Sequence, residues 1–192
     1  MKSVRLWMVL VGVALATPAE ARSVEAWRPY IEEASTRFGV PVDWIERVMR
    51  AESGGRTTLD GRPITSRAGA MGLMQLMPGT WADMRARLGL GSDPHAPRDN
   101  ILAGTYYLRL MYDRFGYPGL FGAYNAGPAR YSAFLAGRSG LPRETRVYMA
   151  AVADRAVLPG AKLCADTFAS APDRAGIVDG REDVLQIFFI RR

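Results

Sequence analysis

One glutamate stands out as a candidate catalytic acid because of the place its helix gives it. Helical spacing is predicted for residues 41–52, with Ile45, Val48 and Met49 as the apolar stripe. Glu52 follows the last two by three and four positions, so it continues the stripe toward the core. Burial and the negative end of the helix dipole both disfavour a charge there and should raise its pKa. A carboxyl group that stays protonated near neutral pH suits a general acid for glycosidic cleavage. The alternative is that Glu52 lies in solvent at a frayed helix end.

The composition excludes or disfavours several other kinds of functional site. The 192 residues include one Cys and one His (His95), which excludes an internal disulfide framework and any multi-cysteine metal cluster, and argues against a His-based triad. We therefore expect no metal and no cofactor. The net charge is +6, but no basic run is interleaved with aromatic residues, so no nucleic-acid binding is predicted. The nearest acid after Glu52 is Asp60, in an Asp-Gly-Arg-Pro sequence typical of a turn, and we interpret it as a turn residue rather than a second catalyst.

Five motifs follow one another along the chain. They are Ala51-Glu52-Ser53-Gly54-Gly55, the segment Ser66 to Pro78 with Gly72-Leu73-Met74-Gln75 inside it, Asn100-Ile101 with Gly104 and Tyr107-Leu108, Ala123-Tyr124-Asn125-Ala126-Gly127-Pro128, and Pro142 to Tyr148. In this order and spacing the set closely resembles the soluble lytic transglycosylase family (SLT domain, glycoside hydrolase family 23 type), over about residues 25–155. The resemblance implies an all-α, mainly helical fold of the lysozyme-like α+β superfamily, as one compact catalytic domain.

The resemblance also implies roles for individual residues. Glu52 falls on the family's single catalytic acid/base. The other matched positions are implied to line the substrate cleft: Ser53, Ser66, Gln75, Met77, Tyr124, Asn125 and Glu144. The implied reaction cleaves the β-1,4 bond between N-acetylmuramic acid and N-acetylglucosamine in peptidoglycan. It leaves a 1,6-anhydromuramoyl end and needs neither metal nor cofactor. The alternatives are a hydrolytic, lysozyme-like muramidase and a non-catalytic wall-binding component of a secretion or conjugation system.

The residues themselves leave simpler interpretations open. Three methionines at a spacing of three also suit a hydrophobic core: Met71, Met74 and Met77. Tyr124 also suits a core, Asn125 to Pro128 suits a turn before a helix, and Glu144 suits the first turn of its helix. One departure from the family pattern is the loop 56–65, which looks longer than in its simplest members and carries the inserted residues 59–62. This insertion leaves the assignment of Glu52 intact but could alter which strand ends or peptide substitutions are accepted.

The elements that must position these residues are helical almost throughout. Apolar residues at helical spacing, with Gly and Pro at the boundaries, predict helices over the following segments: 24–38, 41–52, 78–88, 99–115, 117–124, 128–136 and 142–158. Asp99 is predicted to cap the fourth, which is apolar on most sides and should therefore be central. Residues 53–69 are predicted to form a loop, and no strand is predicted.

The two ends of the chain differ from this pattern. Residues 1–21 combine a basic start, an eleven-residue apolar run and an Ala-x-Ala site, as in a cleavable signal peptide. The run is too short to span a bilayer, so we expect export to the periplasm with no membrane span after cleavage; the alternative is an uncleaved anchor. The domain should then cover residues 22–158.

Residues 159–192 form a tail of unassigned role. Its apolar run, 184–190, either packs on the domain or docks a partner, for which a secretion or conjugation apparatus is one candidate. Cys164 within the tail is either buried or available for an intermolecular disulfide.

Overall fold

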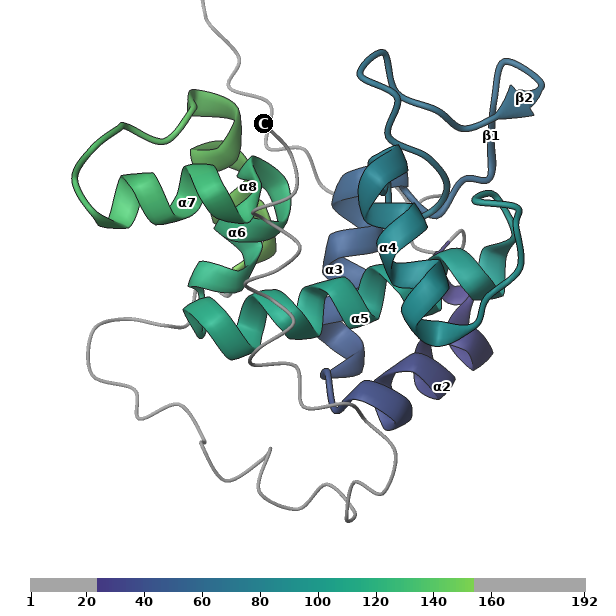
Figure 1. Cartoon of the computed structure of the whole chain (residues 1–192). Helices are drawn as coiled ribbons and strands as arrows, with labels where there is room; N and C mark the ends of the chain where they lie inside the picture. Colours follow the sequence, from purple (N-terminus) through teal and green to yellow (C-terminus); the bar gives the residue numbers. More distant parts are fainter. Residues whose placement is uncertain (1–23, 154–192) are drawn as a thin grey trace, which may run out of the picture.

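The described part of the chain consists of seven helices and one short hairpin (Figure 1). A computed structural model describes residues 24–153, so the predicted signal peptide and the predicted tail, with Cys164, lie outside the described residues. The helices are α2 (Arg28–Phe38), α3 (Val42–Ser53), α4 (Pro78–Leu88), α5 (Pro97–Phe115), α6 (Gly119–Ala126), α7 (Pro128–Leu135) and α8 (Arg143–Val152). The mainly helical single domain predicted from the sequence is confirmed. No helix in residues 24–153 is long and apolar enough to cross a bilayer.

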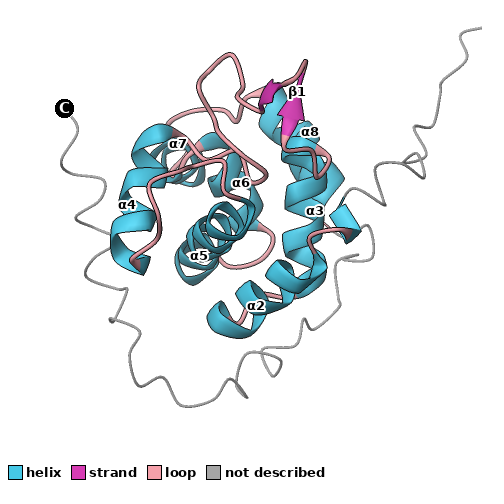
Figure 2. Cartoon of the chain, turned by 90° about the vertical axis from the view of Figure 1, so that its right-hand side faces the viewer, coloured by secondary structure: helices cyan, strands magenta, loops and turns pink. Residues whose placement is uncertain are grey.

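Helix α5 is the centre of the domain. Figure 2 looks almost along its axis and shows the other helices arranged around it. It packs against α2, α4 and α6, and most of its length is buried, as its breadth of apolar residues predicted. It begins at Pro97, however, and not after a cap at Asp99, because proline fits the first turn of a helix. The Asp99 carboxylate instead accepts a hydrogen bond (2.9 Å) from the backbone N–H of Gly91.

The segment predicted as a plain loop contains an antiparallel hairpin, which corrects that prediction. Strand β1 (Thr58–Leu59) pairs with β2 (Arg62–Pro63). The two residues between them, Asp60 and Gly61, have φ angles of 50° and 73°. Positive φ at both positions is typical of a type I′ hairpin turn, for which Asp-Gly is a favoured sequence. Strands of two residues are too short to give a period-two signal. Asp60 is the turn residue that the sequence predicted.

The chain after β2 continues as an irregular loop of turns and isolated bridges that packs against α5. The backbone N–H of Gly72 donates to the carbonyl of Ile64 (3.1 Å), and Met71 makes isolated bridges to Thr65 and to Leu76. The loop residue Met74 is fully buried and packs against Gly104 of α5. A Cβ atom on residue 104 would lie only 2.5 Å from the Met74 Cβ. A side chain at position 104 would therefore push the loop off the helix.

Candidate active site

Three helices bring the candidate acid together with two tyrosines and a second carboxylate. Glu52 lies in the last turn of α3, which Gly54 ends in a left-handed conformation (φ 63°). Tyr124 comes from α6, and Glu144 and Tyr148 come from α8. Helix α8 packs against both α3 and α6. Residues far apart in sequence thus surround one carboxyl group.

The surroundings of Glu52 favour its protonated form. Burial of the carboxyl, and secondarily the negative charge of Glu144, raise its pKa from 4.5 to about 7, against the opposing effect of the Tyr148 hydroxyl. The direction agrees with the expectation from the helical stripe. Val48 and Met49 of that stripe are fully buried, whereas the Glu52 side chain keeps partial exposure to solvent. Glu52 is therefore a carboxylic acid that a substrate can reach and that titrates near neutral pH.

Two buried tyrosines lie near this carboxyl. Tyr148 has a buried hydroxyl without a hydrogen-bond partner among the described residues, and it lies close enough to Glu52 to oppose the rise in the pKa of that carboxyl. The Tyr124 hydroxyl donates to the backbone carbonyl of Met74 (2.8 Å). Burial, and then the nearby Glu52 charge, raise the pKa of both phenols, so both remain hydrogen-bond donors. Tyr107 of α5 packs on Tyr124 with ring centroids 5.3 Å apart and holds it in place.

Ser53 follows Glu52 in the sequence and is buried. Its side chain is 2% exposed, and its hydroxyl donates to the backbone carbonyl of Leu73 (2.8 Å). The same oxygen accepts a hydrogen bond from the backbone N–H of Gly55 (3.1 Å). The prediction that Ser53 contacts substrate does not fit this placement, because protein atoms use its hydrogen-bonding capacity. Ser53 instead ties the end of α3 to the loop that carries Gln75.

Asn100 fixes that loop from the other side. It is fully buried on α5, and its side-chain oxygen accepts a hydrogen bond from the backbone N–H of Met74 (2.7 Å). Its amide nitrogen donates to the carbonyls of Met71 (3.1 Å) and Pro94 (2.8 Å). Met74 is thus held by Asn100 at its N–H and by Tyr124 at its carbonyl. The fully buried Met74 is a core residue, as the simpler interpretation had it.

The remaining predicted cleft residues lie at the surface of the same region. Gln75 is one of two non-glycine residues with positive φ (47°) in the described structure, and its amide donates to the carbonyl of Gly72 (2.8 Å). Backbone strain of this kind persists only where surrounding contacts fix the conformation. Met77, at the start of α4, is 46% exposed, which does not suit a core position. The exposed Ser66 hydroxyl accepts a hydrogen bond from the backbone N–H of Ala70 (3.0 Å).

Glu144 and Asn125 complete the predicted set. Glu144 is exposed in the first turn of α8, close enough to Glu52 for its charge to act on it. Asn125 is half-buried near the end of α6. The sequence interpretation gave no role to Tyr148 or Asn100. A signal for Tyr148 was present, because it follows Glu144 by four residues and so shares its helix face. Within residues 24–153 no cluster of three or more metal-ligand side chains occurs.

Comparison with known proteins finds one matching family. The model of the family described as "Transglycosylase SLT domain" matches residues 29–144, which include Glu52, Tyr124 and Glu144. The chain belongs to this family. The SLT domain chain is 35% identical over 128 residues to a soluble lytic murein transglycosylase of Escherichia coli, a match that covers 63% of this chain and 19% of the relative. It is 34% identical over 91 residues to an endo-type membrane-bound lytic murein transglycosylase A of Klebsiella pneumoniae, covering 44% of this chain and 42% of the relative.

Solved structures show the same fold for the SLT domain. An inactive variant of the lytic transglycosylase Slt from Pseudomonas aeruginosa superposes with a TM-score of 0.59 at 29% identity, over 69% of this chain and 24% of that one. The 70 kDa soluble lytic transglycosylase from Escherichia coli gives 0.57 at 29% identity, over 66% of this chain and 22% of that one. This chain thus spans less than half the length of these relatives.

Proposed function

We propose that this SLT domain protein is a peptidoglycan lytic transglycosylase with Glu52 as its general acid and then its general base. The observation that carries the proposal is the partly buried Glu52 carboxyl, with a pKa of about 7, where α3, α6 and α8 meet. The solved Pseudomonas aeruginosa relative supports it, since that structure is of an inactive glutamate-to-glutamine variant. Relatives named as lytic murein transglycosylases support the substrate class.

The proposed reaction uses one protein acid twice. Protonated Glu52 gives its proton to the oxygen between N-acetylmuramic acid and N-acetylglucosamine, and the bond to the anomeric carbon breaks. The substrate's own acetamido oxygen stabilises the electron-poor anomeric carbon. Glu52, now a carboxylate, takes the proton of the C6 hydroxyl as that oxygen attacks the anomeric carbon. Water is not consumed, and Glu52 ends protonated as it began.

The neighbours of Glu52 are matched to both halves of this cycle. Burial and the Glu144 charge favour the acid form that starts the reaction, and the Tyr148 hydroxyl favours the carboxylate that forms midway. A carboxyl balanced near neutral pH can give up and regain a proton at small cost. Gln75, Met77, Asn125 and Ser66 are proposed to bind the sugars on the open side of the cleft.

The proposed location is the periplasm, reached through the signal peptide predicted at residues 1–21. Partnership with a secretion or conjugation apparatus stays a prediction, and its test is deletion of residues 159–192. Unchanged activity on isolated wall together with unchanged function in cells would contradict a docking role for this tail.

Digestion of purified peptidoglycan in water enriched in oxygen-18 tests the reaction type. Transglycosylation predicts products lighter by one water than hydrolysis products, with no oxygen-18 at the new muramoyl end. Hydrolysis would place oxygen-18 on a reducing end and would contradict the proposal.

The hydrolytic alternative also needs a second carboxylate, for which the sequence offered Asp60. Because Asp60 lies at the tip of the hairpin and is not among the groups that act on Glu52, the products of Asp60→Asn should still carry anhydro ends and no reducing ends. Loss of bond cleavage in this variant would favour the two-acid mechanism.

A further inference from the structure

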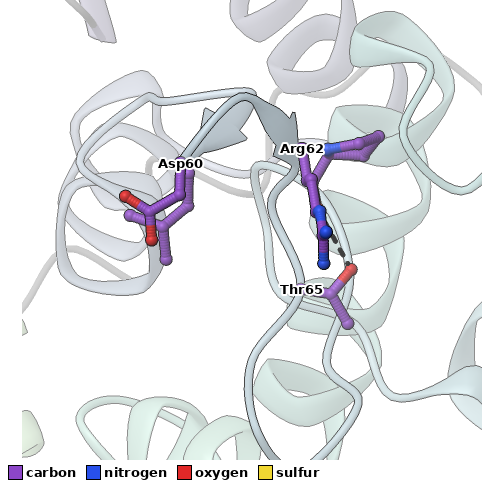
Figure 3. A pocket seen from close by; sticks show the side chains of 5 residues that line it. Asp60, Arg62 and Thr65 are labelled. Carbon is purple, nitrogen blue, oxygen red and sulfur yellow. Dashed lines mark hydrogen bonds between the residues drawn. The ribbon is translucent and has the colours of Figure 1, made fainter.

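An open hollow that the proposed reaction does not use lies at the hairpin. It has a volume of about 500 Å³ and is lined by Leu59, Asp60, Arg62, Pro63 and Thr65. Figure 3 shows Asp60 and Arg62 on the two sides of this hollow, with Thr65 on the side of Arg62. Leu59 is 48% exposed. The hollow therefore combines an apolar wall, a hydroxyl and two opposite charges.

The two charges are not satisfied by each other. Among the residues that the structure describes, neither Asp60 nor Arg62 takes part in an ion pair, although only Gly61 separates them in sequence. The type I′ turn sets the Asp60 backbone, and its exposed carboxylate lies across the hollow from Arg62. Separated charges of opposite sign are complementary to a ligand that carries both an ammonium and a carboxylate group.

The hairpin leads directly along the chain into the segment that carries Ser66, which is proposed above to bind sugar. Strand β2 runs into the extended segment whose Thr65 and Ile64 pair with Met71 and Gly72. Arg62 and Ser66 are four residues apart, a span of at most about 14 Å. A peptide of three or four residues attached to a sugar in the cleft has a comparable reach. A neutral sugar would leave both hairpin charges without a partner.

We propose that the hollow at hairpin residues 58–65 is a subsite for the peptide stem of the peptidoglycan strand. Arg62 binds a stem carboxylate, Asp60 binds a free stem ammonium, and Leu59 and Pro63 contact the aliphatic part of the peptide. The inference rests on the proposed function, because it takes the stem-bearing glycan as the substrate of the same cleft. It makes the hairpin a determinant of which stems, and therefore which regions of the wall, are cleaved.

Comparison of glycan strands with and without peptide stems tests this subsite. Solubilised strands are prepared with intact stems, with stems removed by an amidase, and with the stem ammonium groups acetylated. Arg62→Gln and Asp60→Asn remove one charge each, and asparagine is favoured in this turn. Arg138→Gln, at an exposed site after α7, is the matched control. Each hairpin variant should lower kcat/KM on intact strands by about three- to tenfold, through KM, and leave peptide-free strands unaffected.

The acetylated strands separate the two charges. The kcat/KM of wild type should be lower on acetylated strands than on intact strands, by the same factor that Asp60→Asn lowers it on intact strands. Acetylation should not lower the kcat/KM of Asp60→Asn any further. Equal effects on intact and peptide-free strands, or no effect on either, would overturn the subsite, whatever else binds the hairpin.

A measurement without turnover keeps this result distinct from failure of the proposed function. Titration of an isolated stem peptide should shift the amide NMR signals of residues 58–65, Pro63 excepted, in wild type, and Arg62→Gln should need about three- to tenfold more peptide for the same shift. Absence of these shifts in wild type overturns the subsite. If the shifts occur but wild type forms no product from any strand, the proposed function fails while the peptide site stands.

Discussion

Replacing Glu52 by glutamine should stabilise the folded domain, and the gain should depend on pH. A pKa held at about 7 in the folded protein, against 4.5 in the unfolded chain, means that the folded state binds the proton more tightly. The contribution of Glu52 to the free energy of unfolding is therefore at its full value below pH 4.5 and is lost as pH rises through 7. The full difference corresponds to about 3 kcal/mol. Between pH 5 and pH 8, Glu52→Gln should gain about 2 to 3 kcal/mol over wild type in the free energy of unfolding.

Denaturant unfolding of both proteins at pH 5 and pH 8 measures this gain, with the slope of the transition checked for constancy. Asp83→Asn is the matched control, because Asp83 is an exposed carboxylate on α4. Its effect should be within about 0.5 kcal/mol at both pH values. A Glu52→Gln gain that is the same at pH 5 and pH 8 would refute the reasoning, since it would mean that Glu52 is not ionised at a cost in the folded protein.

Three further substitutions test the surroundings of the site. Glu144→Gln removes a charge that raises the pKa of Glu52, so the loss of activity at alkaline pH should move to lower pH in a rate profile; a shift to higher pH would contradict this. Asn100→Ala should cost about 2 to 4 kcal/mol in the free energy of unfolding, because it leaves the buried N–H of Met74 without its acceptor. Gly104→Ala should cost about 1 to 3 kcal/mol through overpacking against Met74, and a stability equal to wild type would show that the loop can move aside.

The helices were predictable because the sequence marks their ends. Gly39, Gly89 and Gly116 all follow a helix at positive φ, which L side chains seldom adopt, and Pro78 opens one. The hairpin was not predictable as strands, because two-residue strands carry no periodic pattern. Its turn was nevertheless predictable from the Asp60-Gly61 sequence.

The candidate site was predictable where it depends on one helix. The apolar stripe of α3 placed Glu52 toward the core and gave the direction of its pKa. The contribution of Glu144 and the contact with Tyr148 depend on how α8 packs against α3, which no local spacing specifies. The burial of Ser53 was missed for the same reason, because its acceptor is the carbonyl of Leu73 in a separate loop.

Product formation from purified peptidoglycan, followed by mass spectrometry across pH for wild type and Glu52→Gln, tests the central claim most directly. We expect wild type to release 1,6-anhydromuramoyl products at a rate that falls as pH rises through about 7, the pKa of Glu52. Glu52→Gln, with its fold verified by circular dichroism, should release none at any pH. Anhydro products from Glu52→Gln at a rate close to that of wild type would contradict the assignment of Glu52 as the acid that cleaves the bond.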